Sequence, residues 1–225
     1  MKVKTKFCLG GICGALFALL ILLVRTVEVK PIGPEGSSVG FAGINEAVKD
    51  TFSYNETWYK ITQYLGYAAL AIAGCFALLG LVQLIQRKSL FKVDGNIIAL
   101  GVMFVIVIIL YVAFNKIVVN YRPVILPDEG ELEAAFPSSH TVLTCVVMGG
   151  TMLQLPYYVK NQGLRLALNT VLALIILLTV GGRMVSGAHW LTDIMGGVLL
   201  SGALLFVFSG VLDKIESTAK PETVV

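Results

Sequence analysis

Residues 181–193 read GGRMVSGAHWLTD and form a polar stretch between two long apolar runs. This stretch carries Arg183, His189 and Asp193 where two membrane-spanning segments would meet the bilayer surface. Ionisable side chains at membrane depth are costly, which makes them candidates for function. If a helix begins near His189, the four-residue spacing places His189 and Asp193 on one face. There the carboxylate can accept a hydrogen bond from one ring nitrogen and leave the other free to react.

The composition is that of an integral membrane protein. Of the 225 residues, 56% are hydrophobic and 14% are charged, whereas a soluble surface needs far more charge. The net charge of +3 is small, and no nucleic-acid partner is expected. The four cysteines fall inside apolar runs without the spacing of a metal or redox motif, so we interpret them as small buried hydrophobic residues.

Uncharged windows predict six transmembrane helices, at approximately 7–24, 62–86, 96–115, 138–157, 166–182 and 191–212. About 20 apolar residues cross the hydrocarbon as a helix, and the alternation typical of barrel strands is absent. The predicted fold is therefore an all-α integral membrane bundle of six transmembrane helices, with a single domain over residues 1–225. The first span is interpreted as a retained anchor, because no small-residue cleavage site follows it.

The positive charges predict the orientation of the bundle. With a cytoplasmic N-terminus, the inner segments hold ten Lys and Arg residues and the outer segments seven, of which three belong to the candidate site. The positive-inside rule then places both termini in the cytoplasm and the candidate site on the extracytoplasmic face. In the outer segment 25–60, apolar residues recur at three- and four-residue spacing from Phe41 to Tyr59. Either an amphipathic helix that caps the site or a structured loop without a catalytic role fits this pattern, and the loop is favoured.

Three polar clusters fall at the outer ends of the predicted spans. Residues 115–123 close the third span, residues 137–140 open the fourth, and residues 183–193 join the fifth to the sixth. Because all three emerge on one side of the membrane, their side chains can meet in space. Trp190 is expected in an interfacial aromatic belt. Between the first two clusters lie acidic residues that are interpreted as a solvated loop rather than a metal site: Asp128, Glu129, Glu131 and Glu133.

Together the clusters resemble the signature of the type 2 phosphatidic acid phosphatase family, which is related to the vanadium haloperoxidases. The family pattern is a Lys, six residues, then Arg-Pro; later Pro-Ser-Gly-His; later Ser-Arg, five residues, His, three residues and Asp. This sequence has Arg122-Pro123, then Pro137-Ser138-Ser139-His140, then Gly182-Arg183, five residues, His189, three residues and Asp193. The six-span layout also looks like that of the family, so the resemblance covers nearly the whole chain.

The sequence departs from the family pattern at three positions. The family lysine falls on Asn115, and the nearest lysine, Lys116, is one residue late, which on a helix rotates it by about 100°. Ser139 stands where the family has Gly, and it still offers a backbone N–H. Gly182 stands where the family has Ser, so one hydroxyl donor to phosphate is missing.

The resemblance implies catalytic roles for His189, Asp193 and His140. His189 looks like the nucleophile that attacks phosphorus and forms a phosphohistidine. Asp193 would orient His189 and stabilise its cationic form. His140 would donate a proton to the leaving lipid oxygen and later activate water, which suits a group that titrates near neutral pH.

The resemblance also implies phosphate-binding roles. Arg122 and Arg183 would hold the phosphoryl oxygens with their planar guanidinium groups. Ser138 and Ser139 open a helix after Pro137, where backbone N–H groups and the helix dipole favour an anion. Lys116 is a weaker candidate for a third cation.

The expected function is hydrolysis of a lipid phosphate or pyrophosphate monoester at the extracytoplasmic face, without a metal or cofactor. Undecaprenyl pyrophosphate, phosphatidate and phosphatidylglycerol phosphate are candidate substrates, and the partners are the lipid substrate and the bilayer. One alternative is a metal-dependent hydrolase in which two His and one Asp form the metal site, although two nearby arginines would repel the cation. The other alternative is a non-catalytic lipid-binding or transport protein of the same fold.

Overall fold

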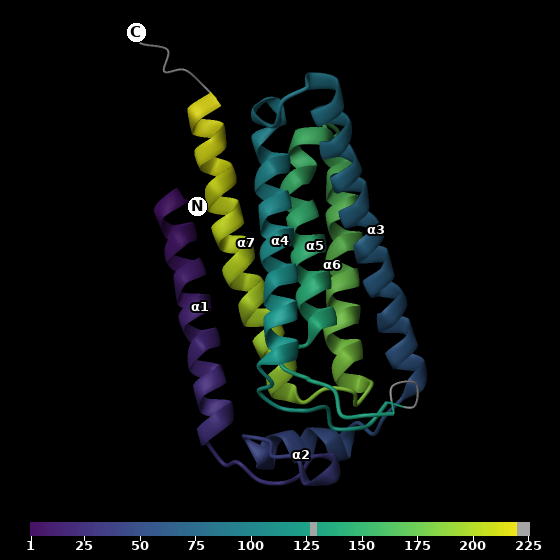
Figure 1. Cartoon of the computed structure of the whole chain (residues 1–225). Helices are drawn as coiled ribbons and strands as arrows, with labels where there is room; N and C mark the ends of the chain where they lie inside the picture. Colours follow the sequence, from purple (N-terminus) through teal and green to yellow (C-terminus); the bar gives the residue numbers. More distant parts are fainter. Residues whose placement is uncertain (127–129, 220–225) are drawn as a thin grey trace.

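The computed structural model describes residues 1–126 and 130–219, and the described chain folds into seven α-helices (Figure 1). Within these residues no strand forms, and β-type pairing is limited to isolated bridges at Lys30–Val39 and Tyr121–Ala134. The all-α fold class is therefore confirmed. The helices are α1 (Val3–Thr26), α2 (Ala42–Thr51), α3 (Glu56–Arg87), α4 (Gly95–Lys116), α5 (Ser139–Tyr158), α6 (Gln162–Val185) and α7 (Leu191–Ala219), with short 3₁₀ turns at Pro34–Gly36 and Leu90–Lys92.

Five helices in the described part of the chain are long and apolar enough to cross a membrane, namely α1, α3, α4, α6 and α7. The protein is thus a multi-pass membrane protein. Helix α5 coincides with the fourth predicted span and has 20 residues, but it is not among these five. Its buried residues include Thr141, Thr144 and Gln154. A helix enclosed by other helices has little lipid to face, so its side chains need not be uniformly apolar.

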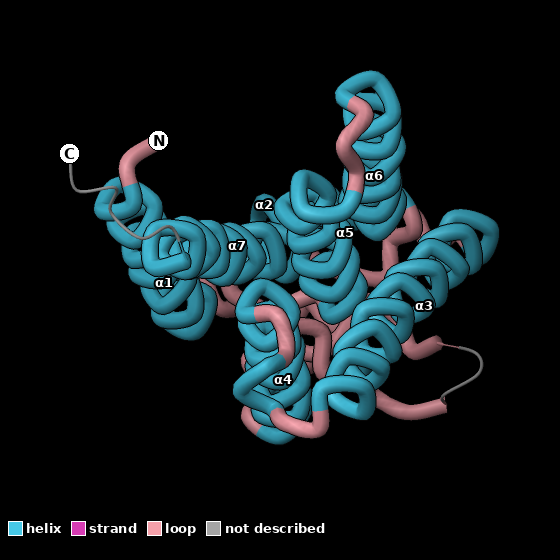
Figure 2. The backbone as a smooth tube through the Cα atoms, turned by 90° about the horizontal axis from the view of Figure 1, so that it is seen from above, coloured by secondary structure: helices cyan, strands magenta, loops and turns pink. Residues whose placement is uncertain are grey.

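Helix α5 lies at the centre of the bundle, where it packs against α3, α4, α6 and α7 (Figure 2). Helix α1 packs along α7 at one edge. One hydrophobic core, which includes Phe17, Phe136 and Leu200, joins α1 and α7 to α4 and α5. A second core, which includes Ala69, Met148 and Leu172, joins α5 to α3 and α6. The central position of α5 fixes its first turn, which carries His140, among the surrounding helices.

Helices α3 and α6 begin before the spans predicted from the sequence because polar residues cap their first turns. Helix α3 begins at Glu56, where the Asn55 side chain accepts a hydrogen bond of 3.0 Å from the Trp58 N–H. Helix α6 begins at Gln162, where Asn161 accepts a hydrogen bond of 2.9 Å from the Leu164 N–H. Uncharged windows mark the apolar part of a helix, whereas its ends are set by caps that lie outside the hydrocarbon.

Between residues 25 and 60 the structure contains a helix, α2, whereas the sequence pattern had favoured a loop. Helix α2 lies across the end of the bundle opposite the two termini (Figure 1). Its buried Asn45 bonds to the first turn of α7: the Asn45 amide nitrogen donates to Thr192 Oγ1 at 3.1 Å, and the Thr192 N–H donates to Asn45 Oδ1 at 3.3 Å. Lys49 Nζ lies 5.3 Å from the ring centre of Trp190. The segment thus supports the turn that joins α6 to α7.

Candidate active site

The three polar clusters converge at the end of the bundle that carries α2, as their positions in the sequence predict. Residues 117–126, residues 130–138 and the turn 186–190 all lie there, while α1 begins and α7 ends toward the other end (Figure 1). The antiparallel bridge between Tyr121 and Ala134 ties the loop to itself. The Trp190 ring N–H donates to the Tyr121 carbonyl at 2.7 Å and so ties the loop to the start of α7.

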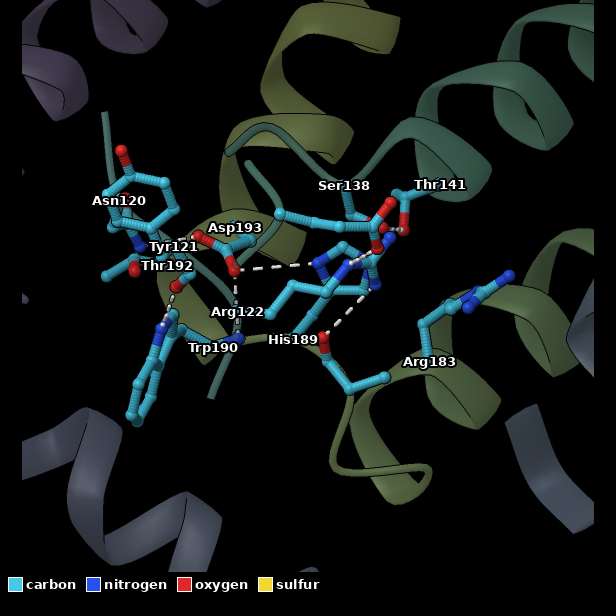
Figure 3. A network of polar contacts seen from close by, with 12 residues as sticks. Asn120, Tyr121, Arg122, Ser138, Thr141, Arg183, His189, Trp190, Thr192 and Asp193 are labelled. Atoms are coloured by element: carbon cyan, nitrogen blue, oxygen red, sulfur yellow. Dashed lines mark hydrogen bonds and ion pairs between the residues drawn. The ribbon is translucent and has the colours of Figure 1, made fainter. Parts of the chain in front are cut away.

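Asp193 is completely buried beside His189 (Figure 3). Asp193 Oδ2 accepts a hydrogen bond of 2.9 Å from the Trp190 N–H and lies 3.5 Å from His189 Nδ1. Asp193 Oδ1 accepts a hydrogen bond of 2.8 Å from the Asn120 side chain. Asn120 was not predicted as a site residue, because the residues around it in the sequence do not indicate that this segment folds onto α7. The carboxylate is therefore held in place by two donors while it faces the imidazole.

Arg122 contacts the opposite nitrogen of the same imidazole (Figure 3). Arg122 Nη1 lies 3.1 Å from His189 Nε2 and 3.3 Å from the Ala188 carbonyl oxygen. A guanidinium group can only donate hydrogen bonds, so Nε2 is the acceptor and carries a lone pair. The neutral ring then has its proton on Nδ1, which faces Asp193. This is the form in which Nε2 can act as a nucleophile.

The surroundings of His189 favour its neutral form. The side chain lies in the turn between α6 and α7 and is almost fully buried. Burial is the main cause that lowers the pKa of His189 well below its ordinary value of 6.5, and the positive charges of Arg122 and Arg183 lower it further. The pKa of His189 is lowered further, by a smaller amount, by His140.

Arg183 is fully buried near the end of α6 with two of its nitrogens unpaired. Its guanidinium carbon lies 4.7 Å from the Tyr59 ring centre, and Nη2 donates to Gln63 Oε1 at 3.3 Å. Nε and Nη1 are buried and have no hydrogen-bond partner among residues 1–126 and 130–219. Unpaired buried donors are costly, and their presence beside a second arginine points to a site for an anion.

A cavity of about 410 Å³ extends from this site between α3 and α4. Arg122, Glu133, Ser139 and His140 line its polar part. His140 lies against α3 at Gly66, where a Cβ atom would come within 2.8 Å of His140 Cδ2. Away from the polar part, the cavity is lined mainly by apolar side chains, among them Leu70, Val107, Ile108, Leu110, Phe114 and Leu143.

The other residues expected at the site occupy different surroundings. The Ser138 N–H donates to the Asp193 carbonyl at 3.0 Å, and its hydroxyl accepts a hydrogen bond of 3.0 Å from Thr141. Ser139 lines the cavity, so it is the serine at the start of α5 that faces the open space. Lys116 is exposed and is not among the residues that line the cavity, whereas Asn115 is.

Close packing between helices explains why glycine stands at position 182. A Cβ atom there would lie 2.6 Å from Thr62 Cγ2 and 3.3 Å from the Trp58 ring, so α3 fills the space that a side chain would need. The hydroxyl that the family places before Arg183 is therefore sterically excluded in this chain. Arg183 instead has Tyr59 and Gln63 as its neighbours, and both belong to α3.

Two expectations about individual residues are corrected by the structure. Trp190 does not lie in an interfacial belt: it is 1% exposed, because its ring packs against Val39 and Ala135 and its N–H bonds to the Tyr121 carbonyl. Glu133 is not simply part of a solvated loop, since its carboxylate forms an ion pair of 2.8 Å with Arg122 Nε. Asp128 and Glu129 lie outside the described residues.

Comparison with known proteins identifies the family. A model of the PAP2 superfamily matches residues 95–216, which is more than half of the chain and includes all three polar clusters. The chain belongs to the PAP2 superfamily. The family resemblance of the sequence motifs is thereby confirmed, and PAP2 membership supports a membrane phosphatase that acts on lipid phosphates.

A solved PAP2 structure has a similar fold. It is the crystal structure of the first transmembrane PAP2-type phosphatidylglycerolphosphate phosphatase from Bacillus subtilis. The similarity covers 95% of this chain and 98% of that one, with a TM-score of 0.65 and 15% sequence identity. At this identity the likeness shows the fold alone. A search of curated proteins gave no match.

Proposed function

We propose that this chain hydrolyses a phosphate or pyrophosphate monoester of a membrane lipid through a covalent phosphohistidine on His189. The observation that carries the proposal is the arrangement around that ring. Asp193 faces Nδ1 at 3.5 Å, Arg122 contacts Nε2 at 3.1 Å, and the buried Arg183 has two unpaired donors nearby. A phosphoryl group would bring the anion that Arg183 lacks among the described residues and would take the place of the Arg122 contact at Nε2.

The proposed reaction has two steps. In the first, His189 Nε2 forms a bond to phosphorus while the bond from phosphorus to the lipid oxygen breaks, and His140 gives a proton to that oxygen. In the second, His140 takes a proton from water as the water oxygen attacks phosphorus, and the bond to Nε2 breaks to release inorganic phosphate. Asp193 stabilises the cationic imidazole between the steps.

The arginines and the start of α5 would bind the transferred group. Arg122 and Arg183 would donate to the phosphoryl oxygens, whose negative charge is concentrated in the transition state. The backbone N–H of Ser139 would add a donor at the positive end of α5. Ser138, whose N–H already bonds to Asp193, would contribute by holding the start of α5 against α7.

The cavity supports a lipid as the substrate. It joins the polar site to an apolar region between α3 and α4, so the phosphate and the first carbons of a lipid chain can be accommodated together. We further propose that α5 is the sixth transmembrane helix and that the chain acts as one membrane-embedded domain. Positive charge near both termini supports a cytoplasmic location for them and an extracytoplasmic active site.

Phosphate release from a panel of lipids tests the proposal. The purified protein in detergent is expected to release inorganic phosphate from phosphatidate, phosphatidylglycerol phosphate or undecaprenyl pyrophosphate, and a chelator such as EDTA is expected to leave the rate unchanged. The expected chelator resistance rests on the donor set, because the Arg122 guanidinium contacts His189 Nε2 and the nearby Arg183 adds a second positive charge, and both would repel a metal cation. Loss of activity in EDTA would support the metal-dependent alternative, and no release from any lipid phosphate would support the non-catalytic one.

The protonation state of His189 gives a second test. Because burial and the two arginines lower its pKa, the neutral ring should persist as the pH falls through 6.5 and should gain a proton only at lower pH. The chain has two histidines, so a His140→Gln variant leaves one histidine signal in the NMR spectrum of protein with isotope-labelled histidine. A titration midpoint clearly below 6.5 is expected, whereas a midpoint at or above 6.5 would contradict this environment.

A further inference from the structure

Glu133 places a negative charge inside the cavity beside the site. Among the described residues that line the cavity, Arg122 is the one cation with a permanent charge and Glu133 is the one carboxylate. The Glu133 side chain is 31% exposed, whereas that of Arg122 is 9% exposed. The carboxylate therefore faces the open space more than the guanidinium does.

Arg122 connects this carboxylate to the reacting atom. Its Nε lies 2.8 Å from Glu133 Oε2, and its Nη1 lies 3.1 Å from His189 Nε2. The carboxylate and the imidazole thus flank a single guanidinium group. The backbone holds this arrangement, because the Arg122 N–H donates to the Glu133 carbonyl at 3.0 Å next to the bridge between Tyr121 and Ala134.

The leaving group of a lipid substrate would lie on the Glu133 side of the site. Its chain needs apolar surroundings, and the cavity that supplies them is lined by both Glu133 and His140. In a phosphate monoester the group next to the transferred phosphoryl is an uncharged alkoxy group of the lipid. In a lipid diphosphate it is a second phosphate, whose negative charge would be repelled by the carboxylate.

The cavity offers little to offset that repulsion. Asn115 lines it with a neutral amide that donates to the Tyr111 carbonyl at 2.9 Å, and the neighbouring Lys116 is exposed outside it. Arg122 is already paired with Glu133. We infer that Glu133 is a specificity-determining residue that makes this site prefer lipid phosphate monoesters to lipid diphosphates. The inference rests on the proposed function and narrows its substrate class.

The variant Glu133→Gln tests the inference, because it removes the charge and keeps the size and an oxygen that can accept from Arg122. The measured quantity is kcat/KM for a lipid diphosphate divided by kcat/KM for a monophosphate with the same chain. We expect this ratio to rise by about tenfold in the variant, equivalent to about 1.4 kcal/mol. Glu131→Gln is the matched control, since Glu131 is an exposed carboxylate of the same loop outside the cavity lining, and its ratio should stay at the wild-type value.

An unchanged ratio in Glu133→Gln would overturn the inference. An unchanged ratio that comes with an equal loss on both substrates would mean that Glu133 only holds Arg122 in place. Binding of an alkyl bisphosphonate relative to an alkyl phosphonate of the same chain length gives the same comparison without turnover, and the relative affinity should rise by about tenfold. If the wild-type protein hydrolyses neither lipid, the proposed function fails, while the binding ratio still decides the role of Glu133.

Discussion

Replacing His189 with alanine is expected to reduce lipid phosphate hydrolysis by at least about 10⁴-fold, because the variant lacks the atom that would form the bond to phosphorus. Arg122 and Asp193 contact opposite nitrogens of this ring, and these two contacts hold it in position to react. Phosphate release from the lipid measures the loss. Alkaline-quenched wild-type protein should carry a phosphohistidine after reaction with labelled substrate, and the His189→Ala protein should carry none.

The variant His140→Ala distinguishes the nucleophile from the acid. An ester with a good leaving group, such as p-nitrophenyl phosphate, needs no proton from His140 to form the phosphohistidine. Hydrolysis of that intermediate does need the base, so His140→Ala should release p-nitrophenol in a burst and accumulate phosphorylated protein. Label in His189→Ala but not in His140→Ala would reverse the two roles. No label in either variant or in wild type would contradict the covalent route.

The sequence predicted the spans and the three clusters because both are local features. A run of uncharged residues is enough to identify a helix such as α4, whose interior is almost uniformly apolar. Because successive spans run in opposite directions, their order along the chain then placed Arg122, His140 and His189 at the same end of the bundle. This arrangement is found in the structure. Helix α5 is less apolar, since its surroundings are other helices and not lipid.

The interactions that the sequence could not predict join residues distant along the chain. Asn120 contacts Asp193, and Asn45 contacts Thr192, only once residues 117–126 and α2 have folded onto α7. Glu133 resembled its acidic neighbours in the sequence, and its pairing with Arg122 follows from the antiparallel bridge beside it. The role of such polar side chains depends on the residue that they contact in the folded protein. Composition and spacing therefore do not distinguish them from other polar residues of the sequence.

Replacing Arg183 with glutamine is expected to lower kcat/KM by about 10²–10³-fold, the usual effect of removing one donor to a developing oxyanion. The same change should leave Tm unchanged or raise it. Arg183 is fully buried, and among the described residues no carboxylate lies within ion-pair distance of it. With no anion bound, the unpaired Nε and Nη1 of Arg183 would each cost about 1–3 kcal/mol, and the substitution removes that cost together with the buried charge.

Stability in the presence of phosphate separates this account from a structural role for Arg183. Inorganic phosphate should raise the Tm of the wild-type protein, because a ligand that binds only the folded state stabilises it, and this rise should be smaller in Arg183→Gln. Arg165→Gln is the matched control, since Arg165 lies at the other end of α6, and both its activity and its response to phosphate should match wild type. A large fall in Tm for Arg183→Gln without phosphate would mean that the guanidinium stabilises the fold. In that case the unpaired Nε and Nη1 of Arg183 would not indicate an anion site.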